Sequence, residues 1–216
     1  RTMPTVYSVT GEARVPAKYG GSMEYAELYC HTYFRLVPKT LFKTHPEYFS
    51  ENDGKRNTHQ ICVTNPDVLK ITIAAVKEQL KRNPRAKFVS VSQEDGYPSC
   101  NCKECKKITD AEGSAAGPLI IFVNKIADAI AKDYPDVKVS TLAYLDTTMP
   151  PKTIRPRDNV VIVLCMPPRP FQTQQQQEEA KLLAKGWESL GAYIHYWDYV
   201  ANYHHSLVPI PNMQVV

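Results

Sequence analysis

The stretch Phe88-Val-Ser-Val-Ser-Gln-Glu-Asp-Gly96 decides the fold that the sequence predicts. Val89 and Val91 alternate with serines, which is the pattern of a strand that buries one face. The strand runs into two adjacent carboxylates, Glu94 and Asp95, on a glycine turn. Loops at the carboxyl ends of strands hold the chemistry in α/β folds. The stretch therefore predicts a parallel sheet with acidic residues at a strand end.

Length and composition predict one domain. The chain has 216 residues, of which 43% are hydrophobic, enough for one sizeable core and too little for two large ones. We expect a single domain over 1–216, with 1–21 left unassigned. The 26 basic residues are scattered among 22 acidic ones and the net charge is +4, so nucleic acid is not an expected partner. No apolar run reaches the length of a membrane span.

Strand and helix patterns alternate along the chain. Asn65 and Pro66 form a helix start, as cap and first helical residue, and Pro84 ends that helix. Apolar residues at helical spacing predict two further helices. The predicted strands are 26–34, 87–93, 137–144, 160–165 and 192–199, the predicted helices are 66–82, 119–130 and 172–190, and 37–64 is predicted to be a long loop.

The alternation of strands and helices implies an α/β fold with a parallel sheet. No glycine-rich phosphate loop follows any strand, and polar or aromatic residues cluster at the strand ends. This favours a TIM-barrel-like (β/α)₈ arrangement over an open doubly wound sheet. A complete barrel typically needs about 250 residues. We therefore expect an incomplete barrel segment, with the remaining barrel and accessory domains on a longer chain.

The acidic residues at strand ends suggest glycoside hydrolysis, which needs a proton donor and a second carboxylate. Asp95 is our first choice for the acid, with Glu94 as its neighbour, because adjacent strand residues point to opposite faces. Asp198, between Trp197 and Tyr199, is the candidate second carboxylate, unless that residue lies outside this chain. The simpler alternative is that Asp95 only caps its own turn.

Further polar and aromatic residues at strand ends are candidates for binding substrate. An aromatic ring with a polar tip suits a sugar, and histidine or aspartate side chains suit its hydroxyls. Each residue also has a simpler alternative role: an aromatic ring can pack in the core, the histidine can be a hydrogen-bonded core residue, and an aspartate can lie in a solvated loop. The candidates are His31, Tyr144, Asp146, Trp197 and Tyr199.

Four cysteines suggest a brace for the acidic loop. Three of them lie close together after the acidic turn, and a fourth follows an earlier segment that a barrel would place nearby. Four thiolates could hold a structural Zn²⁺, or the same residues could form two disulfides. Either arrangement would rigidify the loop that carries Asp95. The four are Cys62, Cys100, Cys102 and Cys105, whereas Cys30 and Cys165 are predicted to be buried free thiols within strands.

Seven motifs follow one another along the chain: Cys30-His-Thr-Tyr-Phe, His45-Pro-Glu-Tyr-Phe, Gly54-Lys-Arg, Gln60-Ile-Cys-Val-Thr-Asn-Pro, Gln93-Glu-Asp-Gly with Cys-x-Cys-x-x-Cys, Leu142-Ala-Tyr and Trp197-Asp-Tyr. This succession resembles the DUF4838 family, over most of the chain from about 26 to 212. That resemblance implies a glycoside-hydrolase-like (β/α)₈ barrel from multidomain, secreted proteins of Bacteroides-like bacteria. More loosely, the chain is similar to α-glucuronidase and β-hexosaminidase barrels, in which acidic residues end the fourth strand.

The sequence-based hypothesis is a glycosidase that is secreted, periplasmic or at the cell surface and acts on an oligo- or polysaccharide without a catalytic cofactor. One alternative is a carbohydrate-binding module that kept the cleft and lost catalysis. Another is a metal-dependent hydrolase. A site of three or four cysteines is closed and leaves no position for substrate, which argues against the metal-dependent hydrolase.

Overall fold

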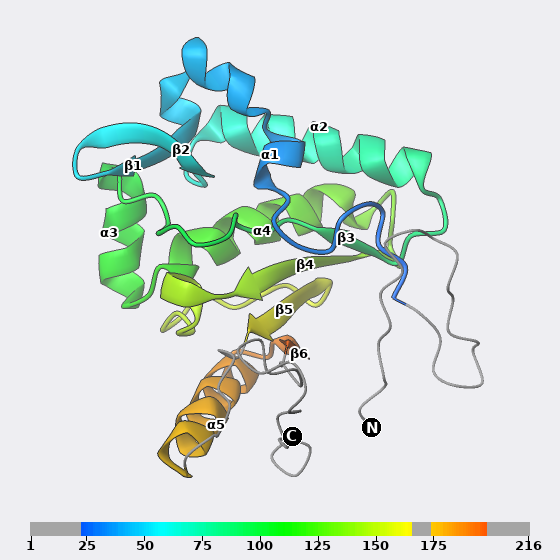
Figure 1. Cartoon of the computed structure of the whole chain (residues 1–216). Coiled ribbons are helices and arrows are strands. Elements are labelled where there is room, and N and C mark those ends of the chain that lie inside the picture. The colour runs from blue at the N-terminus through cyan, green and yellow to red at the C-terminus, as the bar shows by residue number, and fades with distance from the viewer. Residues whose placement is uncertain (1–22, 166–173, 198–216) are drawn as a thin grey trace, which may run out of the picture.

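The computed structural model describes residues 23–165 and 174–197 and shows a mixed α/β architecture (Figure 1). Its main sheet has four parallel strands in the order β3-β4-β5-β6, and a separate two-stranded sheet joins β1 and β2. This confirms the α/β class with a parallel sheet. A closed eight-stranded barrel is not present in the described residues. The main-sheet strands are β3 (Phe88–Ser90), β4 (Lys138–Ala143), β5 (Val160–Cys165) and β6 (Tyr193–Trp197).

The main helices lie close to their predicted positions. Asn65 caps the first of them, because its side chain accepts hydrogen bonds from the backbone N–H groups of Asp67 at 2.9 Å and Val68 at 3.2 Å. This helix packs against the next long helix, and both cover the sheet. The helices are α2 (Pro66–Arg82), α4 (Ala116–Ala131) and α5 (Gln174–Ser189).

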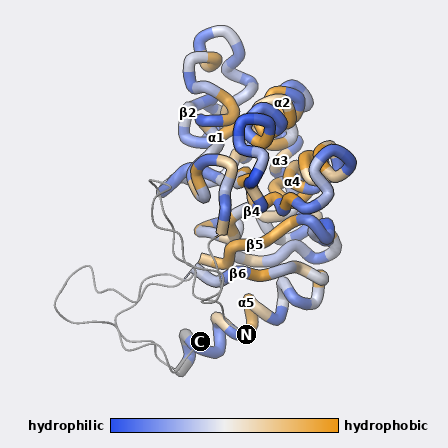
Figure 2. The backbone as a smooth tube through the Cα atoms, turned by 90° about the vertical axis from the view of Figure 1, so that its right-hand side faces the viewer, coloured by the Kyte–Doolittle hydropathy of each residue, from blue (hydrophilic) through white to orange (hydrophobic). Residues whose placement is uncertain are grey.

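Both faces of β5 are buried, which explains its unbroken apolar run. Val139, Ile162 and other residues of one face join the main core with α2 and α4. Leu142 and Val163 form a separate cluster on the opposite face, together with Cys165. Figure 2 shows β5 as a strongly apolar strand between its neighbours. The alternation along β4 and β5 thus separates a helix-covered face from a second face.

The predicted strand 26–34 is wrong for most of its length. Tyr25 makes one parallel bridge with Phe88, beside β3, but the chain then leaves the sheet. His31 has a positive φ of 52°, which turns the backbone out of extended conformation. A short helix, α1 (Tyr33–Leu36), follows. Cys30 is accordingly only partly buried and lies outside any strand, whereas Cys165 is a buried free thiol at the end of β5.

The prediction of a long loop over 37–64 is also wrong. An antiparallel hairpin lies there, and its turn at Asp53 and Gly54 has positive φ at both residues, 52° and 72°. An Asp-Gly pair is a strong hairpin signal, and the neighbouring polar residues hid it. A helix over the cysteine motif was missed too. The added elements are η2 (Lys39–Lys43), η3 (Pro46–Tyr48), β1 (Phe49–Asn52), β2 (Lys55–Ile61), α3 (Lys103–Glu112) and η4 (Leu145–Thr147).

Among the described residues, no single helix is both long and apolar enough to cross a membrane, and only α3 and α4 taken together, bent by 105°, pass such a test by length and composition.

Candidate functional site

The candidate site lies where β3 and β4 end. The segment that precedes α1 is tied to the end of β3, because the Thr32 hydroxyl donates to the Ser90 carbonyl at 3.0 Å. The N–H of Thr32 donates in turn to the carbonyl of Ser92 at 3.1 Å. This brings His31 beside the residues that follow β3, as the prediction of a shared strand-end site requires.

Glu94 is half-buried at this end of the sheet. Its Oε1 accepts a hydrogen bond from the backbone N–H of Phe34 at 3.0 Å. Burial raises the pKa of the Glu94 carboxyl, and the Phe34 N–H and the charge of His31 only partly oppose that effect. A carboxyl in such surroundings keeps its proton to a higher pH than an exposed one.

Asp95 is exposed and has different partners. Its Oδ1 accepts a hydrogen bond from the hydroxyl of Tyr144 at 2.7 Å, which joins the ends of β3 and β4. The His31 ring lies edge-on to the Tyr144 ring, with centroids 6.4 Å apart. His31 Nδ1 lies 2.8 Å from the carbonyl of Gln93 and donates to it, because a carbonyl can only accept. The structure therefore brings together Glu94, Asp95, His31 and Tyr144.

The remaining predicted residues are placed differently. Asp146 holds the cysteine-rich loop, since its carboxylate accepts from the backbone N–H of Ser99 at 2.7 Å and from its hydroxyl at 3.2 Å. Trp197 ends β6, packs on the Leu142 cluster, and has its ring 5.5 Å from that of Tyr29. Asp198 and Tyr199 lie outside the described residues.

Gln60 is a buried side chain that sequence reasoning missed. Its Oε1 accepts from the N–H of Glu94 at 2.9 Å. Its Nε2 donates to the carbonyls of Glu94 at 2.9 Å and of Tyr97 at 3.1 Å. One amide from β2 thus clamps the backbone on both sides of the acidic turn. A glutamine in a polar strand carries no local signal for such a role.

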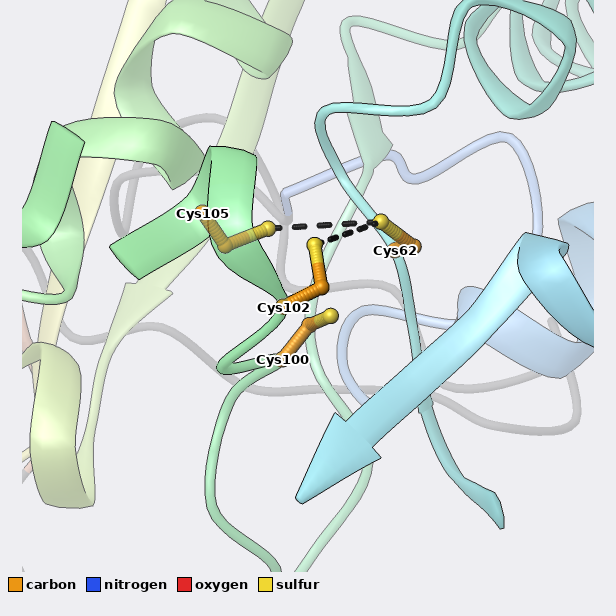
Figure 3. Close-up of side chains that lie close together, drawn as sticks. All are labelled: Cys62, Cys100, Cys102 and Cys105. Carbon is orange, nitrogen blue, oxygen red and sulfur yellow. Dashed lines mark hydrogen bonds between the residues drawn. The ribbon is translucent and has the colours of Figure 1, made fainter. Parts of the chain in front are cut away.

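Four cysteine thiols meet beside this turn (Figure 3). All four are buried, and their Sγ atoms all lie within 4.8 Å of one another. Cys62 Sγ is 3.6 Å from Cys102 Sγ and 4.0 Å from Cys105 Sγ. The sequence places Cys62 in the loop after the predicted strand 26–34, whereas in the structure it follows β2. The predicted residue is therefore part of the cluster, although a different element brings it there. The four are Cys62, Cys100, Cys102 and Cys105.

The spacing of the sulfurs matches the ligand shell of a metal ion. All four cysteines are free thiols. Zn–S bonds of about 2.3 Å in a tetrahedron place sulfurs roughly 3.8 Å apart, which falls between the two distances from Cys62. The four buried cysteines could therefore bind a metal through thiolate ligands alone.

Hydrogen bonds surround the sulfurs as they do in thiolate sites. The backbone N–H of Glu51 lies 3.3 Å from Cys100 Sγ, and the Thr64 hydroxyl lies 3.2 Å from Cys105 Sγ. Arg56 brings its Nη1 to 4.0 Å from Cys100 Sγ. These donors would partly neutralise the negative charge of four thiolates around one divalent ion.

The thiols also perturb one another. Hydrogen bonds from Cys100 and Cys105 lower the pKa of Cys62. The pKa of Cys100 is raised to about 12, because the hydrogen bond from Cys105, which lowers it, is outweighed by the interaction with Cys62 and by burial. Burial and the mutual interaction of the thiols therefore oppose ionisation of the cluster as a whole, and a bound cation would favour it.

The hairpin and the cysteine-rich loop are joined on both sides of the cluster. Asn52 Nδ2 donates to the carbonyl of Ser99 at 2.9 Å, and the N–H of Asn101 donates to the carbonyl of Glu51 at 2.8 Å. Together with Gln60, these bonds tie the loop from Glu94 to α3 against the hairpin. The cysteine cluster and the acidic turn are therefore parts of one connected unit.

Comparison with known proteins finds one family model, described as "Domain of unknown function (DUF4838)", which matches residues 2–216. No curated protein matches the chain.

Proposed function

Since this chain belongs to the DUF4838 family, whose description names no activity, we propose from its own residues that it is a glycoside-hydrolase-like domain acting on an oligo- or polysaccharide. The observation that carries the proposal is the pair Glu94 and Asp95, two adjacent carboxylates in different surroundings where β3 ends. Glycoside hydrolysis needs a carboxylic acid that keeps its proton and a carboxylate that stays ionised. The half-buried Glu94 suits the first of these roles, and the exposed Asp95 beside it can bind the sugar.

The surroundings favour Glu94 as the proton donor. It is half-buried and its pKa is raised by burial, whereas Asp95 is exposed and receives a hydrogen bond from Tyr144. In this scheme Glu94 protonates the glycosidic oxygen, while Asp95 and His31 contact hydroxyls of the sugar. The sequence alone favours Asp95 as the acid, and the experiment below separates the two assignments. The second carboxylate is Asp198 or a residue from outside this chain.

A (β/α)₈ barrel is the architecture we propose around this site. The strands β3 to β6 are parallel and adjacent in the order of the chain, and Tyr25 adds a parallel bridge on the free side of β3. Sequential order is the order of a barrel, whereas doubly wound sheets reverse direction at a switch point. The second buried face, with Leu142 and Val163, would then face the barrel interior.

For the cysteine cluster we propose a structural Zn²⁺. Four thiolates close the coordination shell and leave no position for substrate, which is typical of structural rather than catalytic zinc. The metal would fasten the hairpin to the loop of the acidic turn. The metal-dependent hydrolase is therefore the less favoured alternative.

The proposed partner is a carbohydrate outside the cytoplasm, with the protein secreted, periplasmic or at the cell surface. The family resemblance and the polymeric nature of the substrate support this location, since polysaccharides are degraded outside the cell.

The test is a product-release assay on a panel of plant and host glycans. It compares the full-length protein with Glu94→Gln, Asp95→Asn and the control Asp136→Asn, an exposed carboxylate between α4 and β4. We expect Glu94→Gln to abolish turnover, Asp95→Asn to reduce it and the control to retain it. Turnover lost only in Asp95→Asn would make Asp95 the acid. Glycan binding without turnover by the parent protein would support the carbohydrate-binding module instead.

A further inference from the structure

Tyr97 is an exposed aromatic residue that directly follows the acidic turn. Its exposed fraction is 46%, a value normally found for rings on the surface. Asp95 lies two residues before it, and Gly96, with a φ of +77°, makes the turn between them. The backbone therefore brings this ring to the edge of the candidate site.

The Tyr97 ring has a fixed support on one side. It stacks on the imidazole of His59, with centroids 4.1 Å apart and an angle of 8° between the planes. A nearly parallel stack at this distance covers one face of the ring, so the exposure of Tyr97 belongs to its other face and its edge. An aromatic ring that is held on one face and open on the other forms a flat binding platform.

The same buried amide anchors this platform and the acid. Gln60 is 2% exposed and donates hydrogen bonds from Nε2 to the carbonyls of both Tyr97 and Glu94. His59 precedes Gln60 in β2, so two consecutive residues support the ring and its backbone. One strand therefore anchors the backbone of both Glu94 and Tyr97 and supplies the imidazole on which the Tyr97 ring stacks.

We propose that Tyr97, supported by His59, forms a sugar-stacking subsite next to the Glu94 and Asp95 pair, and this rests on the proposed function. The ligand class is a pyranose unit of a glycan that also reaches the acidic pair. Such a ring has an apolar C–H face that packs on an aromatic plane, and hydroxyls at its edge that suit the polar groups of tyrosine and histidine. Because the platform is already held in place, little conformational entropy is lost on binding.

Another exposed tyrosine of the described residues, Tyr193, lacks these features. Tyr193 is 59% exposed, but it opens β6 at the amino end of the sheet, opposite the edge that carries Glu94. It therefore provides a matched control: an exposed tyrosine of the same chain that no sugar at the candidate site would touch.

The experiment is isothermal titration of the full-length protein with cellohexaose, xylohexaose, mannohexaose and chitohexaose. The variants Tyr97→Ala, Tyr97→Phe, His59→Ala and Tyr193→Ala are then titrated with each hexaose that binds. We expect Tyr97→Ala to weaken binding by about 2- to 10-fold, the range that one aromatic stacking contact supplies. Tyr97→Phe keeps the ring and should retain most of the affinity, His59→Ala should give an intermediate loss, and Tyr193→Ala should give none.

The outcomes separate the two proposals. Binding by the parent protein that both Tyr97→Ala and His59→Ala retain in full overturns the subsite and leaves the proposed function standing. An equal loss in Tyr193→Ala would also overturn it, because the effect would not belong to this position. If no hexaose and no glycan of the release panel binds the parent protein, the proposed function is refuted, and the subsite with it. The loss in His59→Ala decides the matter if Tyr97→Ala does not fold.

Discussion

Replacing Gln60 with alanine is expected to destabilise the protein and to free the acidic turn. Three hydrogen bonds disappear, at 2.9 Å, 2.9 Å and 3.1 Å, and they leave the N–H and carbonyl of Glu94 and the carbonyl of Tyr97 without this partner. An unsatisfied buried group costs about 1 to 3 kcal/mol. Because Glu94 and Tyr97 are partly exposed, water can replace some of these bonds, so we expect about 3 kcal/mol in total.

Urea unfolding measures this loss, and hydrogen exchange at the Glu94 amide reports the local effect. The control is Gln79→Ala, which removes another buried glutamine from α2 outside this turn. We expect faster exchange at Glu94 in Gln60→Ala only, with the metal content unchanged. If Gln60→Ala is no less stable than Gln79→Ala and exchange at Glu94 does not change, Gln60 is not the clamp that the hydrogen bonds indicate.

Three further predictions concern the metal, the acid and a helix cap. The protein purified from zinc-containing medium should carry about one Zn²⁺ per chain by elemental analysis. The variant Cys102→Ser should lose this zinc, whereas the control Cys30→Ser should keep it. Parent protein without bound metal would refute the cluster as a zinc site. The raised pKa of Glu94 means that the native state holds this proton to higher pH than the unfolded chain. Stability therefore falls as the pH rises from the unfolded pKa of about 4.3 through the higher pKa of the folded state. Glu94→Gln should therefore be more stable than the parent to urea at pH 7 and equal to it near pH 3, and a difference independent of pH would contradict the burial argument. Asn65→Ala should lower the free energy of unfolding by about 1 kcal/mol in thermal unfolding, because two N–H groups of α2 lose their acceptor. Asn65→Asp should retain the cap. Equal losses of stability in both variants would argue against capping.

Local signals were sufficient for most of the regular elements. Asn65 and Pro66 mark the start of α2 because a cap and a first-turn proline act within a few residues, and the apolar run of β5 shows burial on both faces. The same logic failed at 26–34, where the aromatic composition predicts a strand but His31 adopts a positive φ. It failed also at the hairpin of β1 and β2, whose polar strands lack a clear alternation of apolar residues.

Residue types and their spacing along the chain are enough to predict the α/β class, the acidic turn at the end of β3 and the identity of the clustered cysteines. The surroundings of these residues depend on the tertiary structure. Glu94 meets Phe34 across 60 positions and Gln60 across 34, and Asp95 meets Tyr144 across 49. Cys62 likewise joins Cys102 from 40 positions away. Partners at such separations are chosen by how strands and loops pack, and that packing makes Glu94 half-buried and leaves Asp95 exposed.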